Sequence, residues 1–370
     1  MNMRMTTKYF WIAALAIGIM ASACHDEEEP EPIDVVEDIE VGDDPQAPPP
    51  DITTMYFPPA GSDEWETVDA SVVGWDSANF ASAIQFAHDH GSYSLMILHK
   101  GRIVTENYWK GRSVDSETDL ESVSKSLMAF VVGVLQQDGT LKLDDKVSDY
   151  LGEGWSQSPS TEGDITIRHL LTMTSGLNEE LKWISAPGET WRYCHAAFDK
   201  LHKVIEKATD ISYGRNFEKL LFEPIGMHQH SWYGTDLHAS ARDIARYGLL
   251  ILNKGSWNDQ KLIQDDGYFS DMLSTSQPMQ KAYGYLWWLN GKEDWYDDEL
   301  KVTNEGPIAS TLPSDAVLAK GKRDQRIYIV PGLDIVVIRQ GGDTGLPEIG
   351  EGSFDVEFWK RMMSAINPSH

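Results

Sequence analysis

Apolar and polar positions follow two different periods along this chain, and each period predicts a different kind of element. Residues 94–99 and 102–108 are apolar-rich runs separated by Lys100 and Gly101, a pattern typical of two strands joined by a tight turn. Residues 122–137 carry apolar side chains at spacings of three and four, which predicts a helix with one broad buried face. Gly139 follows as a helix stop signal.

Helical spacing recurs along the middle of the chain, and strand patterns return near its C-terminal end. We expect further helices over residues 166–174, 196–209, 213–222, 240–253 and 354–366. Residues 326–330 and 334–339 have strand character and are separated by Pro331 and Gly332. Strands toward both ends with helices between them predict an α+β domain whose sheet joins the two ends. The sequence contains no internal repeat.

Composition supports a globular domain and argues against one class of partner. The chain has 370 residues, of which 41% are hydrophobic, with 13 Trp, 14 Tyr and 11 Phe. Such a composition can bury a sizeable core. The formal net charge is -27, and Lys and Arg do not cluster. Because nucleic-acid binding needs a dense basic face, we expect no nucleic-acid partner.

The first 60 residues differ from the rest in composition. Arg4 and Lys8 precede an apolar run over residues 9–20, which is too short to span a bilayer comfortably and has the layout of a secretory signal. The run ends in Ala-Ser-Ala before Cys24, which resembles a bacterial lipobox, although that pattern prefers Leu where Ala21 stands. The sequence therefore predicts an exported bacterial lipoprotein of the cell envelope, held to a membrane by lipid on Cys24.

The segment after Cys24 is predicted to be a tether. Residues 25–50 contain eleven Asp and Glu, no Lys or Arg, and several prolines, so the segment repels itself and stays extended. It either acts as a surface-export signal, as in some lipoproteins, or is a solvated spacer. We accordingly divide the chain into a signal peptide (1–23), a tether (24–60) and a globular domain (61–370). With Cys24 lipidated, Cys194 is left without a disulfide partner and is expected to be a small buried residue.

Two residues at the start of the predicted 122–137 helix carry candidate chemistry. Ser122 and Lys125 are three positions apart, so they lie on one helical face. A serine hydroxyl becomes a useful nucleophile when a base is within reach, and a buried lysine can be that base. Free N–H groups at a helix N-terminus also favour developing negative charge. Ser-x-x-Lys alone is a weak signal because both residue types are common.

The surrounding sequence resembles the serine β-lactamase and penicillin-binding-protein superfamily, and in particular the class C β-lactamase-related hydrolases. The resemblance covers about residues 90–365 and rests on segments that occur in the family's order: 122–151, 165–177, 187–210, 223–227, 240–248, 283–288 and 325–340. It implies a β-lactamase/transpeptidase-like fold, in which helices flank an antiparallel sheet built from both chain ends and a mostly helical subdomain is attached.

The same resemblance implies roles for three residues. Ser122 would be the acylated nucleophile and Lys125 its helper. Tyr193 matches the tyrosine of the family's Y-x-N motif and would act as general base, with a pKa lowered by Lys125. His195 stands where that motif has Asn, so it either binds substrate and tunes Tyr193 or is a structural histidine.

The family's third motif, K-T-G, is absent, and a related form stands in its place. Gly321 and Gln325 match the G-x-x-G-Q form of the carboxylesterase and nylon-oligomer-hydrolase relatives, but Asp324 replaces the usual Gly. The resemblance therefore implies that Gly321 and Gln325 belong to the oxyanion and substrate-binding site. The backbone N–H of Lys322 is expected to complete an oxyanion hole with that of Ser122. Lys320, Lys322 and Arg323 either bind a substrate carboxylate or form a solvated strand end.

Other candidate sites add little. His88 with His90, and His228 with His230, have a spacing that can hold a metal ion, but neither pair comes with a carboxylate pattern, so we expect no metal and no other cofactor. Trp191 and the pair Trp287–Trp288 are candidate walls of an apolar acyl pocket.

The sequence thus favours a serine hydrolase that acts on an ester, amide or peptide-like small molecule through an acyl-enzyme. The missing K-T-G and Y-x-N motifs rank an esterase or amidase above a β-lactamase or D-amino-acid peptidase. A further alternative is an inactive binding protein of the envelope that keeps the fold, which the replacements at His195 and Asp324 suggest.

Overall fold

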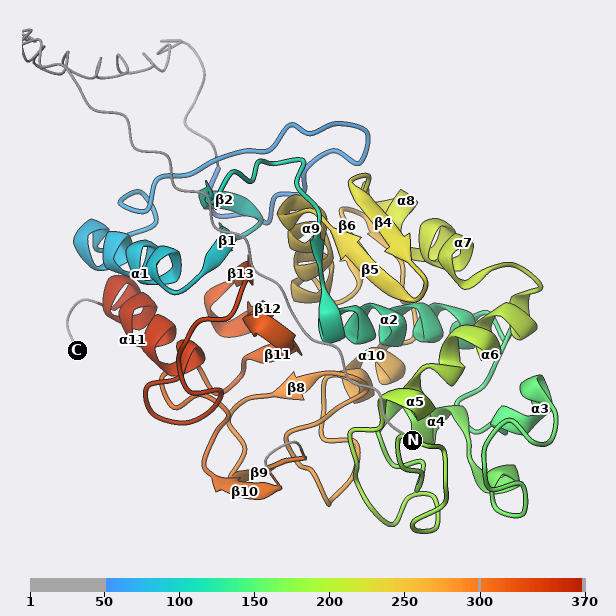
Figure 1. Cartoon of the computed structure of the whole chain (residues 1–370). Coiled ribbons are helices and arrows are strands. Elements are labelled where there is room, and N and C mark those ends of the chain that lie inside the picture. The colour runs from blue at the N-terminus through green and yellow to red at the C-terminus, as the bar shows by residue number, and fades with distance from the viewer. Residues whose placement is uncertain (1–50, 299–300, 368–370) are drawn as a thin grey trace, which may run out of the picture. The chain divides into compact units, whose positions relative to one another are not determined.

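A six-stranded antiparallel sheet forms the centre of the computed structural model, which describes residues 51–298 and 301–367 (Figure 1). The predicted signal peptide, Cys24 and the tether up to residue 50 lie outside the described residues. The strand order is β2 (Arg102–Tyr108), β1 (Ser92–His99), β13 (Ile335–Gly341), β12 (Gln325–Val330), β11 (Val317–Gly321) and β8 (Trp288–Leu289).

The two ends of the described chain meet in this sheet. β1 pairs with β13 in a register that places Leu98 opposite Val336 and Ile97 opposite Val337. The predicted α+β fold, with an antiparallel sheet built from both ends, is therefore confirmed. The hairpin between β1 and β2 turns at Lys100 and Gly101, whose φ angles of 47° and 81° are those of the hairpin turn that favours glycine.

Helices cover both faces of the sheet. On one face α1 (Ser77–Asp89) and α11 (Phe354–Ile366) lie side by side (Figure 1), joined by a hydrogen bond from the Asp76 N–H to the Ala365 carbonyl at 2.8 Å. Their buried residues form one apolar cluster with the sheet. On the other face α9 (Ala241–Leu252) packs on β13, β12 and β1, and α2 (Ser124–Gln137) belongs to the same, larger cluster.

A helical subdomain is inserted between the strands of the two ends. Its short helices are α3 (Val147–Leu151), η2 (Glu162–Asp164), α4 (Ile167–Leu171), α5 (His195–Phe198), α6 (Lys200–Thr209), α7 (Tyr213–Phe217), the π-turn η3 (Glu218–Phe222), α8 (Glu223–Ile225) and, nearer the sheet, α10 (Asp266–Met272). The predicted 196–209 helix divides at Asp199, and the predicted 166–174 helix ends early because Met173 has a φ of 58°.

Smaller elements complete the described chain. A three-stranded sheet orders β3 (Thr118–Asp119), β5 (Asp236–Ala239) and β4 (His230–Tyr233), and two hairpins join β6 (Ser256–Trp257) to β7 (Gln260–Lys261) and β9 (Asp294–Asp297) to β10 (Val302–Glu305). Short 3-10 turns are η1 (Glu121–Val123), η4 (Lys322–Asp324) and η5 (Pro331–Leu333). In the part of the chain that the structure describes, no helix combines the length and apolar character needed to cross a membrane.

Residues 51–60, which we assigned to the end of the tether, contact the domain. The Tyr56 N–H donates to the Lys100 carbonyl at 2.9 Å. The buried Arg246 guanidinium donates to the carbonyls of Pro58 and Pro59 at 3.4 and 3.2 Å. The packed part of the chain therefore begins before residue 61.

Candidate active site

The start of α2 is fixed by the small sheet that precedes it. The Leu120 N–H donates to the Leu237 carbonyl at 3.0 Å, so β3 and β5 hold the chain just before Ser122. Glu121 has a φ of 51°, and its N–H donates to Asp119 Oδ1 at 2.9 Å. Left-handed backbone is costly for residues other than glycine and is found most often at functional sites. Ser122 follows on the 3-10 turn η1.

Lys125 lies in the first turn of α2 and reaches back to Ser122. Its Nζ donates to Ser122 Oγ at 3.1 Å, and only 2% of the residue is exposed. The ammonium lies 4.7 Å from the centre of the Phe198 ring. Burial lowers the pKa of Lys125 from 10.5 to about 8, against the opposing effect of Asp199, Glu179 and other nearby carboxylates. A substantial fraction of this lysine is therefore neutral at mildly alkaline pH.

Tyr193 precedes α5 in an extended segment anchored on both sides. The Arg192 N–H donates to the Met173 carbonyl at 2.9 Å, and the buried Cys194 thiol donates to the Asn178 carbonyl at 3.3 Å. Burial raises the pKa of Tyr193 to about 12, although a hydrogen bond with the Ser122 side chain acts to lower it. The expected lowering of this pKa by Lys125 is thus wrong: burial has the largest effect, and the nearby Glu179 carboxylate also raises the pKa of Tyr193.

Gly321, the last residue of β11, is in direct contact with the turn that carries Ser122. A Cβ atom at this position would lie 2.7 Å from the Leu120 carbonyl oxygen and 3.0 Å from Glu121 Cβ. Only glycine lets β11 approach η1 so closely. As a result Ser122 and Lys322 line the same cavity, each within a 3-10 turn whose first N–H groups lack intrahelical acceptors.

The structure of the η4 turn after Gly321 shows how Asp324 is accommodated at a position where the relatives have glycine. Arg323 and Asp324 have φ angles of 56° and 54°, a conformation that glycine adopts freely, so the relatives' glycine fits this position. In this chain the Asp324 carboxylate accepts hydrogen bonds from Arg326 at 2.6 Å and from Thr344 at 2.8 Å. These two bonds hold the left-handed turn in the absence of glycine.

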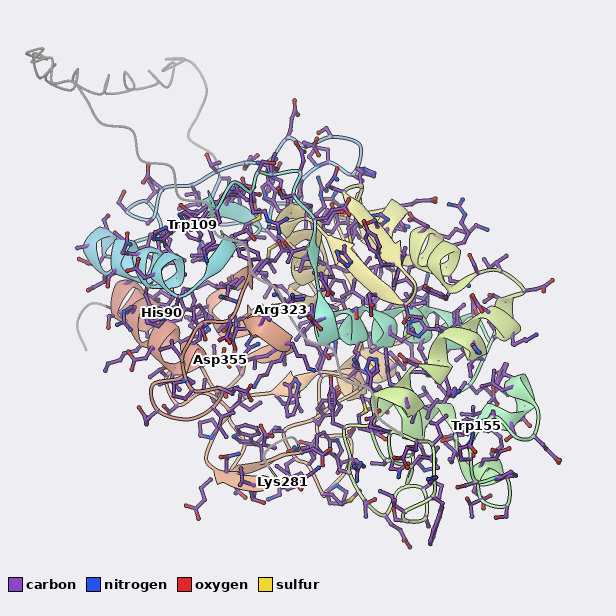
Figure 2. The ribbon with its side chains drawn as sticks, in the orientation of Figure 1. His90, Trp109, Trp155, Lys281, Arg323 and Asp355 are labelled. Carbon is purple, nitrogen blue, oxygen red and sulfur yellow. The ribbon has the colours of Figure 1, made fainter. Side chains whose placement is uncertain are left out.

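The three cations near this turn have different surroundings. Arg323, which Figure 2 labels, donates to Glu121 Oε1 at 2.5 Å and to Asp119 Oδ2 at 3.1 Å, so these two carboxylates neutralise its charge. Lys320 Nζ lies 4.0 Å from Asp355 Oδ2 and between the rings of Trp288 and Trp295. Lys322 is exposed like Arg323, but of the three cations it is the one without a carboxylate partner among the described residues. The expected cationic patch is therefore reduced to one available ammonium.

His195 is an exposed residue of the cavity that Ser122 and Lys125 also line. Its side chain is 55% exposed, and its Nε2 is 3.5 Å from Asp199 Oδ2. The N–H groups of His195 and Ala196 donate to the two Glu179 carboxylate oxygens at 2.7 and 3.0 Å, so Glu179 caps α5. His195 and Glu179 both line the cavity, and nothing in the sequence around Glu179 indicated that role.

Gln325 has a different place from the one expected. It is 1% exposed, its Nε2 donates to the Gly341 carbonyl at 2.6 Å, and its Oε1 accepts from the Gly341 N–H at 3.1 Å. The amide is used entirely to join β12 to β13, and the residue does not line the cavity. The assignment of Gln325 to substrate binding is therefore corrected to a structural role.

The cavity around Ser122 has a volume of about 800 Å³. Trp191, Tyr193 and Trp288 form an aromatic wall, in which the Tyr193 and Trp288 rings stack with centroids 6.3 Å apart. Trp287, expected in the same wall, is instead fully buried against Tyr247. Nine carboxylate side chains and five Lys or Arg side chains line the cavity, so its lining is net negative.

The candidate histidine pairs bind other groups. His88 and His90 contact Asp89 and the Thr344 carbonyl, while His228 and His230 contact the Ala60 carbonyl and Glu218. Within residues 51–298 and 301–367 no three His, Cys, Asp or Glu side chains are grouped so that they could hold a metal ion.

This fold, with serine and lysine three residues apart at the start of a buried helix, defines a β-lactamase-type protein. The chain belongs to the beta-lactamase family, whose model matches residues 78–338. An uncharacterized protein of Alkalihalophilus pseudofirmus is 25% identical over 305 residues, which are 70% of this chain and 86% of that protein.

Two further relatives have named activities. The D-alanyl-D-alanine-carboxypeptidase/endopeptidase AmpH of Escherichia coli K12 is 25% identical over 181 residues, 40% of this chain and 47% of AmpH. The 6-aminohexanoate-dimer hydrolase of Paenarthrobacter ureafaciens is 21% identical over 257 residues, 54% of this chain and 64% of that enzyme. The chain thus spans less than two thirds of either enzyme.

Solved structures share the fold. A beta-lactamase from Mycobacterium bovis superimposes with a TM-score of 0.59 at 16% identity, over 77% of this chain and 99% of that one. A penicillin-binding protein from Bacillus halodurans gives a TM-score of 0.57 at 15% identity, over 78% and 99% of the two chains. The β-lactamase/transpeptidase-like fold expected from the sequence is confirmed, and named members of the family are hydrolases.

Proposed function

We propose that the protein is a serine hydrolase that cleaves an ester or amide through an acyl-enzyme on Ser122. The observation that carries this proposal is the 3.1 Å contact between Ser122 Oγ and the buried Lys125 Nζ, whose pKa is lowered to about 8. A nucleophile beside a base of this pKa is what acyl transfer near neutral pH requires.

In the proposed acylation, neutral Lys125 accepts the Ser122 proton as Oγ bonds to the substrate carbonyl carbon. Tyr193, with a pKa raised to about 12, then acts as the acid that protonates the leaving group. This assignment reverses the general-base role expected for Tyr193. In deacylation, water attacks the acyl carbon and gives its proton to the Tyr193 phenolate, while Lys125 returns its proton to Ser122 Oγ. Each group ends in its starting state.

The negative charge on the tetrahedral intermediate needs hydrogen-bond donors, and two backbone groups are candidates. These are the N–H groups of Ser122 and Lys322, which lie in the facing turns η1 and η4 and border the same cavity. Such a pair typically contributes a factor of about 100 to 1,000 in rate for each donor. Gly321 supports the arrangement because it allows the two turns to approach.

The substrate is proposed to be an ester or amide with a small apolar acyl group. The aromatic wall of Trp191, Tyr193 and Trp288 suits such a group. One relative is named for hydrolysis of an amide dimer and another for D-alanyl peptide cleavage, so both amide classes belong in a substrate screen. His195 in place of Asn and the missing K-T-G motif favour esters and simple amides over β-lactams.

We also propose that the protein is exported and anchored to a membrane by lipid on Cys24. The apolar run over residues 9–20 and the small residues before Cys24 support this. The acidic segment after Cys24 would hold the hydrolase domain away from the membrane surface.

The decisive experiment follows both product release and intact mass when the purified full chain meets a short-chain p-nitrophenyl ester. We expect nitrophenol release and an acyl adduct that maps to Ser122, and we expect neither in Ser122→Ala. Ser124→Ala is the matched control, because Ser124 lines the same cavity but donates its hydroxyl to the Glu121 carbonyl at 2.7 Å. Equal activity in wild type and Ser122→Ala would refute the nucleophile.

A folded wild type that neither releases product nor gains mass with esters, amides, D-alanyl peptides and β-lactams would favour the non-catalytic alternative. The protein would then be a binding protein of the envelope. Ligand-dependent thermal shifts with the same compounds would identify what it binds.

A further inference from the structure

Arg326 is a buried arginine on β12 that contacts the peptide unit containing the candidate oxyanion donor, the Lys322 N–H. It is 5% exposed, and its Nε donates to Asp355 Oδ1 at 2.9 Å. Nη2 donates to Asp324 Oδ1 at 2.6 Å and to Asp355 Oδ2 at 3.4 Å. The remaining nitrogen, Nη1, donates to the Gly321 carbonyl at 3.2 Å and to the Gln325 carbonyl at 3.1 Å.

The contact with Gly321 determines the direction of the next N–H group. The Gly321 carbonyl and the Lys322 N–H belong to one planar trans peptide unit, so they point in opposite directions. Arg326 lies on β12 and holds the carbonyl on the β12 side of β11. The Lys322 N–H must therefore point to the other side of β11.

That other side of β11 is open at this end. β8 pairs with β11 only at Val317 and Leu318, so no described strand covers the edge at Gly321 and Lys322. Both residues line the cavity that contains Ser122. An N–H group directed to this edge is available to a ligand in the cavity.

We propose that Arg326 is a positioning residue of the oxyanion hole, which holds the Gly321 carbonyl and thereby directs the Lys322 N–H toward the acyl carbonyl on Ser122. This inference rests on the proposed acyl-enzyme and goes beyond it by naming a residue that acts through the Gly321 carbonyl. A charged donor on the carbonyl also polarises the peptide unit, which strengthens the hydrogen bond that its N–H donates.

Arg326 itself is held rigidly. Asp355, the second residue of α11, is 2% exposed and also accepts a hydrogen bond from the Tyr328 hydroxyl at 2.5 Å (Figure 2). Burial alone would lower the pKa of Arg326, but the Asp355 and Asp324 carboxylates outweigh burial and raise it, so the guanidinium stays charged. Both carboxylates come from elements outside β12.

The C-terminal part of the η4 turn is also held in place. Arg339, 1% exposed on β13, donates from Nη1 to the carbonyls of Arg323 and Asp324 at 2.8 Å each. Two buried arginines thus hold the carbonyls of Gly321, Arg323 and Asp324, and the Gln325 N–H donates to the Lys322 carbonyl between them. Every carbonyl from Gly321 to Asp324 therefore has a hydrogen-bond donor, so the turn that supplies the Lys322 N–H is fixed.

The test compares Arg326→Lys with wild type by the infrared band of the acyl carbonyl. Lysine keeps the positive charge beside Asp355 but lacks the second nitrogen needed to reach Gly321. Each protein is acylated with a slowly hydrolysed ester labelled with carbon-13 at the carbonyl, and the labelled band is isolated by difference. A carbonyl that accepts weaker hydrogen bonds absorbs at higher wavenumber, and a change in global stability alone does not move this band.

We expect the Arg326→Lys band to shift to higher wavenumber and the acylation rate to fall about 10- to 100-fold, with the KM for substrate little changed. Arg102→Lys is the control, because Arg102 is also a buried strand arginine, and it binds a carboxylate, Glu66, and a carbonyl, Thr54, away from the cavity. It should leave both the band and the rate unchanged.

A folded Arg326→Lys variant with the wild-type band and rate overturns the inference. Should that variant not fold, Asp324→Asn serves instead: it weakens one anchor of Arg326 and is expected to shift the band in the same direction by less, and an unchanged band overturns the inference. If wild type forms no acyl adduct on Ser122, the proposed function fails, and the inference that depends on it fails with it.

Discussion

At the scale of single residues, burial shifts the pKa values of the two candidate proton-transfer groups, Lys125 and Tyr193, in opposite directions. Lys125 and Tyr193 are both removed from water near Ser122, yet burial acts on them in opposite senses. It lowers the pKa of the lysine to about 8 because the charged form is the protonated one, and it raises that of the tyrosine to about 12 because the charged form is the deprotonated one. At mildly alkaline pH this leaves one candidate base and one candidate acid near the same hydroxyl.

The first prediction concerns pH. Since only neutral Lys125 can accept the Ser122 proton, we expect kcat/KM to rise with pH and to level off above an apparent pKa of about 8. The measurement is a pH profile of ester hydrolysis corrected for spontaneous cleavage. Lys125→Arg, which stays protonated over this range, should lose at least 100-fold in kcat/KM and show no such rise. A profile that is flat between pH 6 and 9 would contradict the role of Lys125.

The second prediction concerns stability. The folded pKa of Lys125 is lowered from 10.5, so between about pH 8 and 10.5 the unfolded chain binds more protons than the folded chain. Stability should therefore rise with pH across that window, and below it the buried ammonium is destabilising. We expect Lys125→Met to increase the free energy of unfolding at pH 7 by about 1–2 kcal/mol while abolishing hydrolysis.

Urea unfolding of both proteins at pH 7 and pH 10 checks this expectation. The advantage of Lys125→Met should shrink at pH 10, where lysine is neutral in the folded state. Ser124→Ala provides the comparison for a substitution in the same turn that leaves the lysine in place. If Lys125→Met were less stable than wild type at both pH values, the contacts of the ammonium would contribute more to the free energy of unfolding than its desolvation costs.

At the scale of elements, the close contact between β11 and η1 decides the geometry of the site. Gly321→Ala would introduce a Cβ 2.7 Å from the Leu120 carbonyl, and the strand would have to move away from the turn. We expect a loss of about 1–3 kcal/mol in stability and at least a tenfold loss in the acylation rate, because the Lys322 N–H moves with β11.

Gly163→Ala is the matched control for this substitution. No atom lies within 4 Å of the Cβ that would be added there, and Gly163 does not line the cavity. Thermal unfolding and single-turnover acylation, measured on both variants, separate general damage from loss of alignment. If Gly321→Ala were acylated at the wild-type rate, the close approach of β11 to η1 would not be needed for acylation.

The sequence predicted those elements whose local pattern agrees with their final place. The 94–108 hairpin, the 240–253 helix and the 354–366 helix correspond closely to β1 and β2, α9 and α11. Short elements such as β8 and β3 were not predicted, because two residues carry no periodic signal and these strands form only through long-range pairing.

The site was predictable only where residue type and spacing carry the chemistry. Ser122 and Lys125 could be paired because a three-residue spacing on a helix brings side chains together. The direction of the Tyr193 pKa, the use of Gln325 to join two strands and the cavity position of Glu179 all depend on burial and distant partners. Arg326 looked like an ordinary strand residue, since its contacts come from Asp355 and Asp324 on other elements.

At the scale of the whole molecule, the candidate site depends on segments far apart in the chain. Ser122 and Lys125 belong to η1 and α2, whereas Gly321 and Arg326 belong to β11 and β12, strands that join the N-terminal hairpin through β13. The cavity lining is net negative, as is the chain as a whole with a net charge of -27. An anionic substrate would be repelled on approach, so neutral and cationic esters or amides are the better first choices in a screen.

The last prediction concerns where the molecule resides. Two or more acyl chains on Cys24 would anchor the protein stably, so in a bacterial host it should sediment with membranes and enter the detergent phase on phase separation. Cys24→Ser should move it to the soluble fraction with its hydrolase activity intact, because the domain that carries Ser122 is a separate compact unit starting at Asp51. Cys194→Ser is the control: the Cys194 side chain is buried within that domain, so its loss should not change the fractionation. If Cys24→Ser remained with the membranes, lipid on this cysteine would not be the anchor.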